Sequence, residues 1–102
     1  MPVRLTDYEI KAIKELAKKF FGEDSKVFIF GSRAHLEKRG GDIDIYIETK
    51  LSIKEIAKNK IKFLAELDLK IGEQKTDLVV FNPLVMKKEL IHKVALEEGI
   101  EI

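Results

Sequence analysis

Two aspartates in a strongly alternating stretch are the first residues of this sequence that could do chemistry. Asp42 and Asp44 open the run Asp-Ile-Asp-Ile-Tyr-Ile-Glu at residues 42–48, in which every second residue is isoleucine. This is the period of a β-strand, so we expect both carboxylates on one face and the isoleucines on the other. The two Cα atoms would be about 6.5–7 Å apart at a rise of roughly 3.3 Å per residue. Carboxylate side chains can close that gap around one hard cation such as Mg²⁺.

A third acid at the head of another strand strengthens the metal interpretation. Taken alone, the alternating run is also typical of a solvent-facing edge strand, and an aspartate that begins a strand is ordinary. Asp77, however, precedes the apolar run Leu-Val-Val-Phe at residues 78–81. Aspartate is depleted from strands, and two like charges on one strand face repel each other. Three such acids in one short chain therefore indicate a function more than solvation.

The dipeptide Gly31-Ser32 could supply an anion site. It follows Val27–Phe30, a wholly apolar run that predicts a buried strand. Glycine permits close backbone approach, a turn presents free N–H groups, and the serine hydroxyl can donate to a phosphate oxygen. The Walker pattern G-x-x-x-x-G-K-[ST] does not occur, so P-loop hydrolysis is not supported. Arg33, Lys38 and Arg39 could add positive charge in the same loop, although Lys38 and Arg39 are more typical of solvated loop charges than of ligands.

The helices and strands that must position these residues follow from hydrophobic period and capping signals. Capping boxes at Thr6 and Ser52 predict two helix starts. In the first half we expect a helix from Thr6 to Gly22, a strand at 27–30, a loop at 31–41 with a turn of helix, and a strand at 42–48. A helix of about 15 residues then begins at Ser52 and ends near 68–71, and a strand follows at 76–81. The last elements are a helix from Asn82 and Pro83 to Gly99 and a short edge strand at 100–102. This order predicts an α/β (α+β) fold with one mixed sheet flanked by helices.

The composition sets limits on the class of protein. The chain has 102 residues, 45% hydrophobic and 36% charged, which fits one packed domain over residues 1–102. Lys+Arg is 19 and Asp+Glu is 18, so a protein that coats nucleic acid is not expected. The absence of cysteine excludes disulfides, thiolate zinc sites and a thiol nucleophile. No apolar run approaches the roughly 20 residues of a membrane span, and there is no signal-peptide core, so we expect a cytoplasmic protein with no membrane contact.

Taken together, these motifs resemble the signature of the DNA polymerase β-like nucleotidyltransferase superfamily. The segment at residues 31–44 has Gly-Ser, nine intervening residues and Asp-x-Asp, and Asp77 stands where the later third acid is expected. In its length the chain is most similar to the minimal nucleotidyltransferases, the MNT-type antitoxins often encoded beside a HEPN-domain toxin. The resemblance covers nearly the whole chain and implies the polymerase-β-like nucleotidyltransferase fold.

The resemblance also implies an activity. It implies a magnesium-dependent transfer of AMP from ATP to a hydroxyl group, most directly a tyrosine of a partner HEPN-type toxin that the modification silences. The chain would then be a protein adenylyltransferase that binds ATP and holds Mg²⁺ in a two-metal site. Asp77 would in addition help to deprotonate the acceptor hydroxyl. The implied nucleotide-binding residues are Gly31, Ser32 and Arg33, and the implied catalytic and metal-binding residues are Asp42, Asp44 and Asp77.

Two other functions stay open at this point. The chain could be a non-catalytic binding module that masks a partner toxin, or it could transfer a nucleotide to a small molecule, although no acceptor-binding extension is visible. A template-directed polymerase and direct contact with nucleic acid are not expected, because no template-binding domain is present and the charges balance. A chain of this length offers one catalytic wall, so a partner should complete the site, and a homo-oligomer is also compatible with it.

Overall fold

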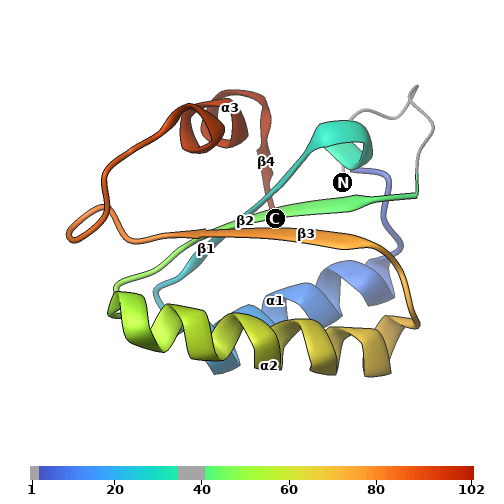
Figure 1. Cartoon of the computed structure of the whole chain (residues 1–102). Helices are drawn as coiled ribbons and strands as arrows, with labels where there is room; N and C mark the ends of the chain where they lie inside the picture. Colours follow the sequence, from blue (N-terminus) through green and yellow to red (C-terminus); the bar gives the residue numbers. More distant parts are fainter. Residues whose placement is uncertain (1–2, 35–40) are drawn as a thin grey trace.

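The computed structural model describes residues 3–34 and 41–102, and the statements below concern these residues (Figure 1). The chain forms three α-helices, four strands and one 3₁₀ turn, in the order predicted from the sequence. The elements are α1 (Asp7–Phe21), β1 (Lys26–Phe30), η1 (Gly31–Ala34), β2 (Ile43–Glu48), α2 (Ile53–Ile71), β3 (Thr76–Phe81), α3 (Leu90–Glu98) and β4 (Ile100–Glu101).

The strands form one mixed sheet in the order β3-β2-β1-β4. β1 pairs antiparallel with both β2 and β4, whereas β2 pairs parallel with β3 through the α2 crossover. Helices α1 and α2 cover one face of the sheet and α3 lies on the other (Figure 1). The predicted α+β fold with a mixed sheet and a short terminal edge strand is therefore confirmed. None of the helices in the described residues combines the length and apolar character that a membrane crossing needs.

Local signals set the ends of α1 and α2. Thr6 accepts a hydrogen bond from the Glu9 backbone N–H at 3.1 Å, and the Glu9 carboxylate accepts from the Thr6 N–H at 2.9 Å, which is the predicted capping box. Ser52 also caps α2, accepting from the backbone N–H of Glu55 at 3.2 Å, but the capping box predicted there is incomplete, because the Glu55 carboxylate accepts from the Ser52 hydroxyl at 3.1 Å and not from its backbone N–H. Helix α2 has 19 residues and ends at Ile71, the far end of the predicted range.

The main core lies between the sheet and the pair α1 and α2. The isoleucines of β2 at positions 43, 45 and 47 are fully buried there, together with side chains such as Ile13 and Phe63. Because side chains alternate along a strand, the residues between these isoleucines point to the α3 face. The acid-bearing face of β2 is consequently held in place by the isoleucines on the opposite face of the same strand, which are buried in the core.

The third helix begins later than predicted. α3 starts at Leu90, and the expectation that Pro83 would be its first residue is wrong. Asn82 closes a turn instead of capping this helix, whose N-cap is Glu89: its side-chain oxygen accepts from Leu84 N at 2.9 Å and its carbonyl accepts from Met86 N at 3.0 Å. The buried Asn82 amide also donates to the Leu51 carbonyl at 2.8 Å, and its own N–H donates to the Met86 sulfur at 3.3 Å. These contacts fold the segment into a single turn, and helix formation begins again after Glu89.

Candidate functional site

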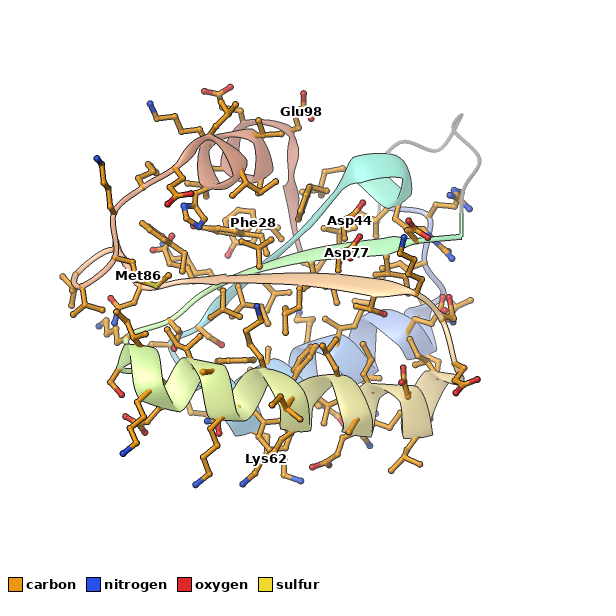
Figure 2. The ribbon with its side chains drawn as sticks, in the orientation of Figure 1. Phe28, Asp44, Lys62, Asp77, Met86 and Glu98 are labelled. Atoms are coloured by element: carbon orange, nitrogen blue, oxygen red, sulfur yellow. The ribbon has the colours of Figure 1, made fainter. Side chains whose placement is uncertain are left out.

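Strand pairing brings two of the predicted acids side by side. Asp44 of β2 is the register partner of Asp77 of β3 in the parallel pair, and neighbouring strands lie about 4.8 Å apart. Both side chains are on the sheet face that α3 partly covers, opposite α1 and α2 (Figure 2). Asp42 lies immediately before β2 and two residues before Asp44, so strand alternation places it on the same face. The predicted acids thus lie on one face of the sheet, at the end where β2 and β3 begin; we call this region the acidic edge.

The acids at this edge carry negative charge that is only partly compensated. Burial raises the pKa of the half-buried Asp44 carboxyl, and the charges of Asp77 and Asp42 and a hydrogen bond with Asp77 raise it further. Lys75 acts in the opposite direction on the same pKa. The Lys75 ammonium lies 3.6 Å from an Asp42 carboxylate oxygen, in an ion pair that is largely exposed and hence weak. Among residues 3–34 and 41–102, the positive charge near Asp44 is therefore too small to balance its acidic neighbours.

The donor chemistry of this edge fits a divalent cation. Carboxylate oxygens are the ligands that Mg²⁺ prefers, and a cation beside Asp44 would reverse the repulsion that raises its pKa. Within residues 3–34 and 41–102, no three histidine, cysteine, aspartate or glutamate side chains are already drawn together into a metal-binding group.

Gly31 joins the predicted anion loop to the acidic strand. It follows Phe30, whose register partner on β2 is Asp44, and it has a positive φ of 68°. A Cβ atom at this position would collide with the Asp44 carboxylate oxygen Oδ2. Only glycine leaves room for that approach, so the backbone of η1 begins directly against the carboxylate of Asp44. Ser32 follows in the same 3₁₀ turn.

The Arg33 side chain connects three segments of the chain at the end of the sheet. Its guanidinium donates hydrogen bonds to the carbonyl of Arg4 at 2.8 Å, the carbonyl of Gly41 at 3.3 Å and the side-chain oxygen of Gln74 at 3.3 Å. These partners precede α1, β2 and β3 respectively. Arg33 therefore fixes how the two acid-bearing strands begin. Direct contact between Arg33 and a nucleotide stays a prediction, and Lys38 and Arg39 lie outside the described residues.

Sequence reasoning missed Gln74 and Lys75. The Gln74 amide donates to the Glu9 carboxylate at 3.0 Å and to the Ile71 carbonyl at 3.3 Å, while its oxygen accepts from Arg33. Lys75 pairs with Asp42 across the strands. Their only sequence signal is that both directly precede the strand that carries Asp77, because their partners are remote in sequence.

Replacing Arg33 by alanine is expected to lower the free energy of unfolding by about 1–3 kcal/mol, because charge-assisted hydrogen bonds to three segments are lost. For a chain of this size that corresponds to a fall in Tm on the order of 5–15 °C. Thermal denaturation followed by circular dichroism measures it. Lys14→Ala, which removes an exposed cation from α1, should move Tm by no more than ~2 °C. An Arg33→Ala variant that melts with the wild type would show that these contacts are not stabilising.

Aromatic side chains close the same sheet face under α3. Tyr46 is fully buried, with its ring centroid 5.7 Å from that of Phe28 and 6.3 Å from that of His92. Burial, with a smaller effect from the nearby Glu48 carboxylate, raises the pKa of Tyr46 to about 12. Tyr46 therefore shares the acids' face of β2 and packs there. Helix α3 covers this aromatic half, and the acids lie at the other half of the face, where Asp77 is exposed.

Comparison with known protein families gives one match. The model of the nucleotidyltransferase domain family matches residues 10–102. This range includes the three candidate acids Asp42, Asp44 and Asp77, together with Gly31 and Ser32. No curated protein matches the sequence at a significant level.

Proposed function

This chain belongs to the nucleotidyltransferase domain family, and from that premise we propose that it transfers AMP from ATP to a hydroxyl acceptor in a magnesium-dependent reaction. Transfer of a nucleotidyl group is the general activity of the family, whose domains generally use divalent metals. The observation that best supports the proposal is the neighbouring pair Asp44 and Asp77, with Gly31 packed directly against Asp44.

The three acids have distinct places in the proposed reaction. Asp42, Asp44 and Asp77 would hold the metal ions, whose charge neutralises the triphosphate and stabilises the entering and leaving oxygens. Asp77 is the most exposed of the three and stands at the open end of the face, where an acceptor can reach it. It would take the proton of the acceptor hydroxyl. The acceptor oxygen then bonds to the α-phosphorus, the bond from that phosphorus to the bridging oxygen breaks, and pyrophosphate leaves.

The proposed acceptor is a tyrosine on a partner protein, a HEPN-type toxin in the interpretation that the sequence motifs favour. Asp77 is exposed, and α3 covers the aromatic half of the sheet face rather than the half that carries the acids. A residue presented by a partner could therefore approach the acids from the side of Asp77. In this proposal the modified toxin is inactive, so the chain acts as an antitoxin by catalysis.

A label-transfer assay tests the proposal. The chain is incubated with ATP labelled at the α-phosphate, MgCl₂ and the product of the neighbouring gene, and mass spectrometry locates the adduct. Label is expected on a tyrosine of the partner, and it should be lost with EDTA and in the Asp42→Asn and Asp44→Asn variants. Parallel reactions with GTP, CTP and UTP test the choice of nucleotide.

The matched control is Glu48→Gln, which exchanges a carboxylate for an amide on the same face of β2 but at its far end. This variant should keep full transfer. If the Asp42→Asn and Asp44→Asn variants still neutralise the partner and the wild type transfers no label, the chain is a masking module and the proposal is wrong. Label that appears on a small molecule but never on protein would reject the tyrosine acceptor alone.

A further inference from the structure

The outer face of α2 exposes apolar side chains that the fold does not use. The inner face of this helix buries Ile56, Phe63 and Leu67 against the core. On the outer face, Ile61 is 73% exposed and Leu69 is 85% exposed. Scattered apolar residues on a surface need no explanation, so the arrangement of the residues around Ile61 decides whether this face has a role.

The residues around Ile61 form a stripe with a symmetric pattern. The α2 stripe consists of Lys54, Ala57, Ile61, Ala65 and Asp68, and all five are exposed. At about 100° per residue they lie within about 40° of Ile61 around the helix. Alanines stand four residues before and four after Ile61, and opposite charges stand seven residues before and seven after it. The stripe therefore reads the same in both directions, except that its two ends carry opposite charge.

The charged ends of the stripe have no partners of their own. Neither Lys54 nor Asp68 takes part in an ion pair of the described residues, where the pairs are Lys11–Glu15, Lys19–Glu66 and Lys75–Asp42. Within the helix, the positions three and four residues away from Asp68 carry no basic side chain, and those after Lys54 carry no acid. Both charges are available to an incoming surface.

We propose that α2 is an interface through which two copies of this chain associate, antiparallel and with the two-fold axis at Ile61. This rotation places Lys54 of each copy opposite Asp68 of the other, and Ala57 opposite Ala65. The two Ile61 side chains meet at the centre, where the small alanines on either side allow the helices to approach. The three- and four-residue spacing of the stripe matches helices packed about 20° from antiparallel. A self-complementary patch is what a two-fold dimer requires.

Two features limit the affinity. One pair of helices buries less than the roughly 1,200 Å² of a stable interface. Lys58 and Lys62 flank the stripe on one side. In the proposed dimer these two lysines of one copy lie near the same two lysines of the other copy, and the like charges repel. We therefore expect a dissociation constant of about 10–100 µM.

Association through α2 leaves the acids accessible. Asp44 and Asp77 lie on one side of the sheet, whereas Lys62 marks the outer side of α2 on the other (Figure 2). The dimer would carry two outward-facing acidic edges, each able to meet its own acceptor. The proposed dimer does not depend on the proposed nucleotidyl transfer. Association of the chain therefore does not decide whether it transfers a nucleotide, and transfer does not decide whether it associates.

Sedimentation equilibrium from about 5 to 500 µM in about 0.15 M salt tests the interface. The weight-average mass of the wild type should rise from 11.7 kDa towards twice that value as the concentration increases. Ile61→Asp should remain at the monomer mass throughout, because two carboxylates would meet on the axis. A wild type that stays monomeric across this range would overturn the proposal.

A charge-reversal series tests the antiparallel pairing itself. Lys54→Glu and Asp68→Lys should each weaken association about tenfold, because each creates two like-charge contacts in the dimer. The double variant should return to within about threefold of the wild type. Lys14→Glu makes the same charge change on α1 and should have no effect. If the double variant is not rescued, the copies do not pair about Ile61. Because every substituted side chain is exposed, thermal melts should confirm that each variant is folded.

Discussion

Replacing Asp44 by asparagine is expected to reduce the rate of nucleotidyl transfer by about 10³-fold and, at the same time, to make the metal-free protein more stable. In the proposed reaction the rate falls because Asp44, the register partner of Asp77 and two residues from Asp42, would be a metal ligand. Initial rates of label transfer measure this effect, with Glu48→Gln as the control. A variant that keeps a tenth or more of the wild-type rate would remove Asp44 from the proposed metal site.

The gain in stability follows from the raised pKa of Asp44. Because burial and the neighbouring acids raise that pKa in the folded state, the charged form of Asp44 is better tolerated in the unfolded chain. Protonation of Asp44 therefore stabilises the folded state fully at pH values below the ordinary pKa of 3.8. This stabilisation is lost as the pH rises through the raised pKa of the folded protein. In EDTA at pH 7, Asp44→Asn should therefore melt higher than the wild type. The difference should shrink towards pH 4. A variant that melts lower than the wild type at pH 7 would contradict this account.

Replacing Gly31 by alanine is expected to lower the transfer rate by about 10²-fold and the free energy of unfolding by about 2–3 kcal/mol. The positive φ at this position is strained for alanine, and the added Cβ would displace the Asp44 carboxylate. Kinetic assays and denaturant unfolding measure the two effects separately.

Gly22→Ala is the matched control for this substitution. Gly22 also has a positive φ, of 105°, but a Cβ there would meet no atom within 4 Å. This variant should lose stability, by about 1 kcal/mol, and keep its activity. If Gly31→Ala and Gly22→Ala behave alike, the contact between Gly31 and Asp44 does not matter for the reaction.

The elements and the acids could be predicted because their signals are local. A capping box at Thr6, the alternation after Asp42 and the apolar run before Gly31 each depend on residues close together in the chain. The same signals identified which face of β2 carries the acids. They could not give the register between β2 and β3, which makes Asp44 the neighbour of Asp77 across the long α2 crossover.

The remaining differences also come from contacts between distant residues. Asn82 was expected to cap the third helix, but its hydrogen bonds, including one to the distant Leu51 carbonyl, close only a turn, and Glu89 is the N-cap of α3. The hydrogen bonds of Arg33 within the fold could not be predicted either, because its partners Arg4, Gly41 and Gln74 come from separate parts of the chain and no local pattern connects them. Its contact with a nucleotide stays a prediction.

The parallel pairing of β2 with β3 also has a consequence for the order in which the site is assembled during synthesis. The antiparallel β1–β2 pair can form once Glu48 has left the ribosome, and that pair already carries Asp42 and Asp44. Asp77 can join them only after the whole of α2 has been made, because a parallel pair requires a crossover. Gln74, a hydrogen-bond partner of Arg33, emerges at the same late stage. A nascent chain that ends at Ile71 would thus contain a strand pair with two acids but no neighbouring acid on β3, so the acidic edge becomes complete only when translation has passed β3.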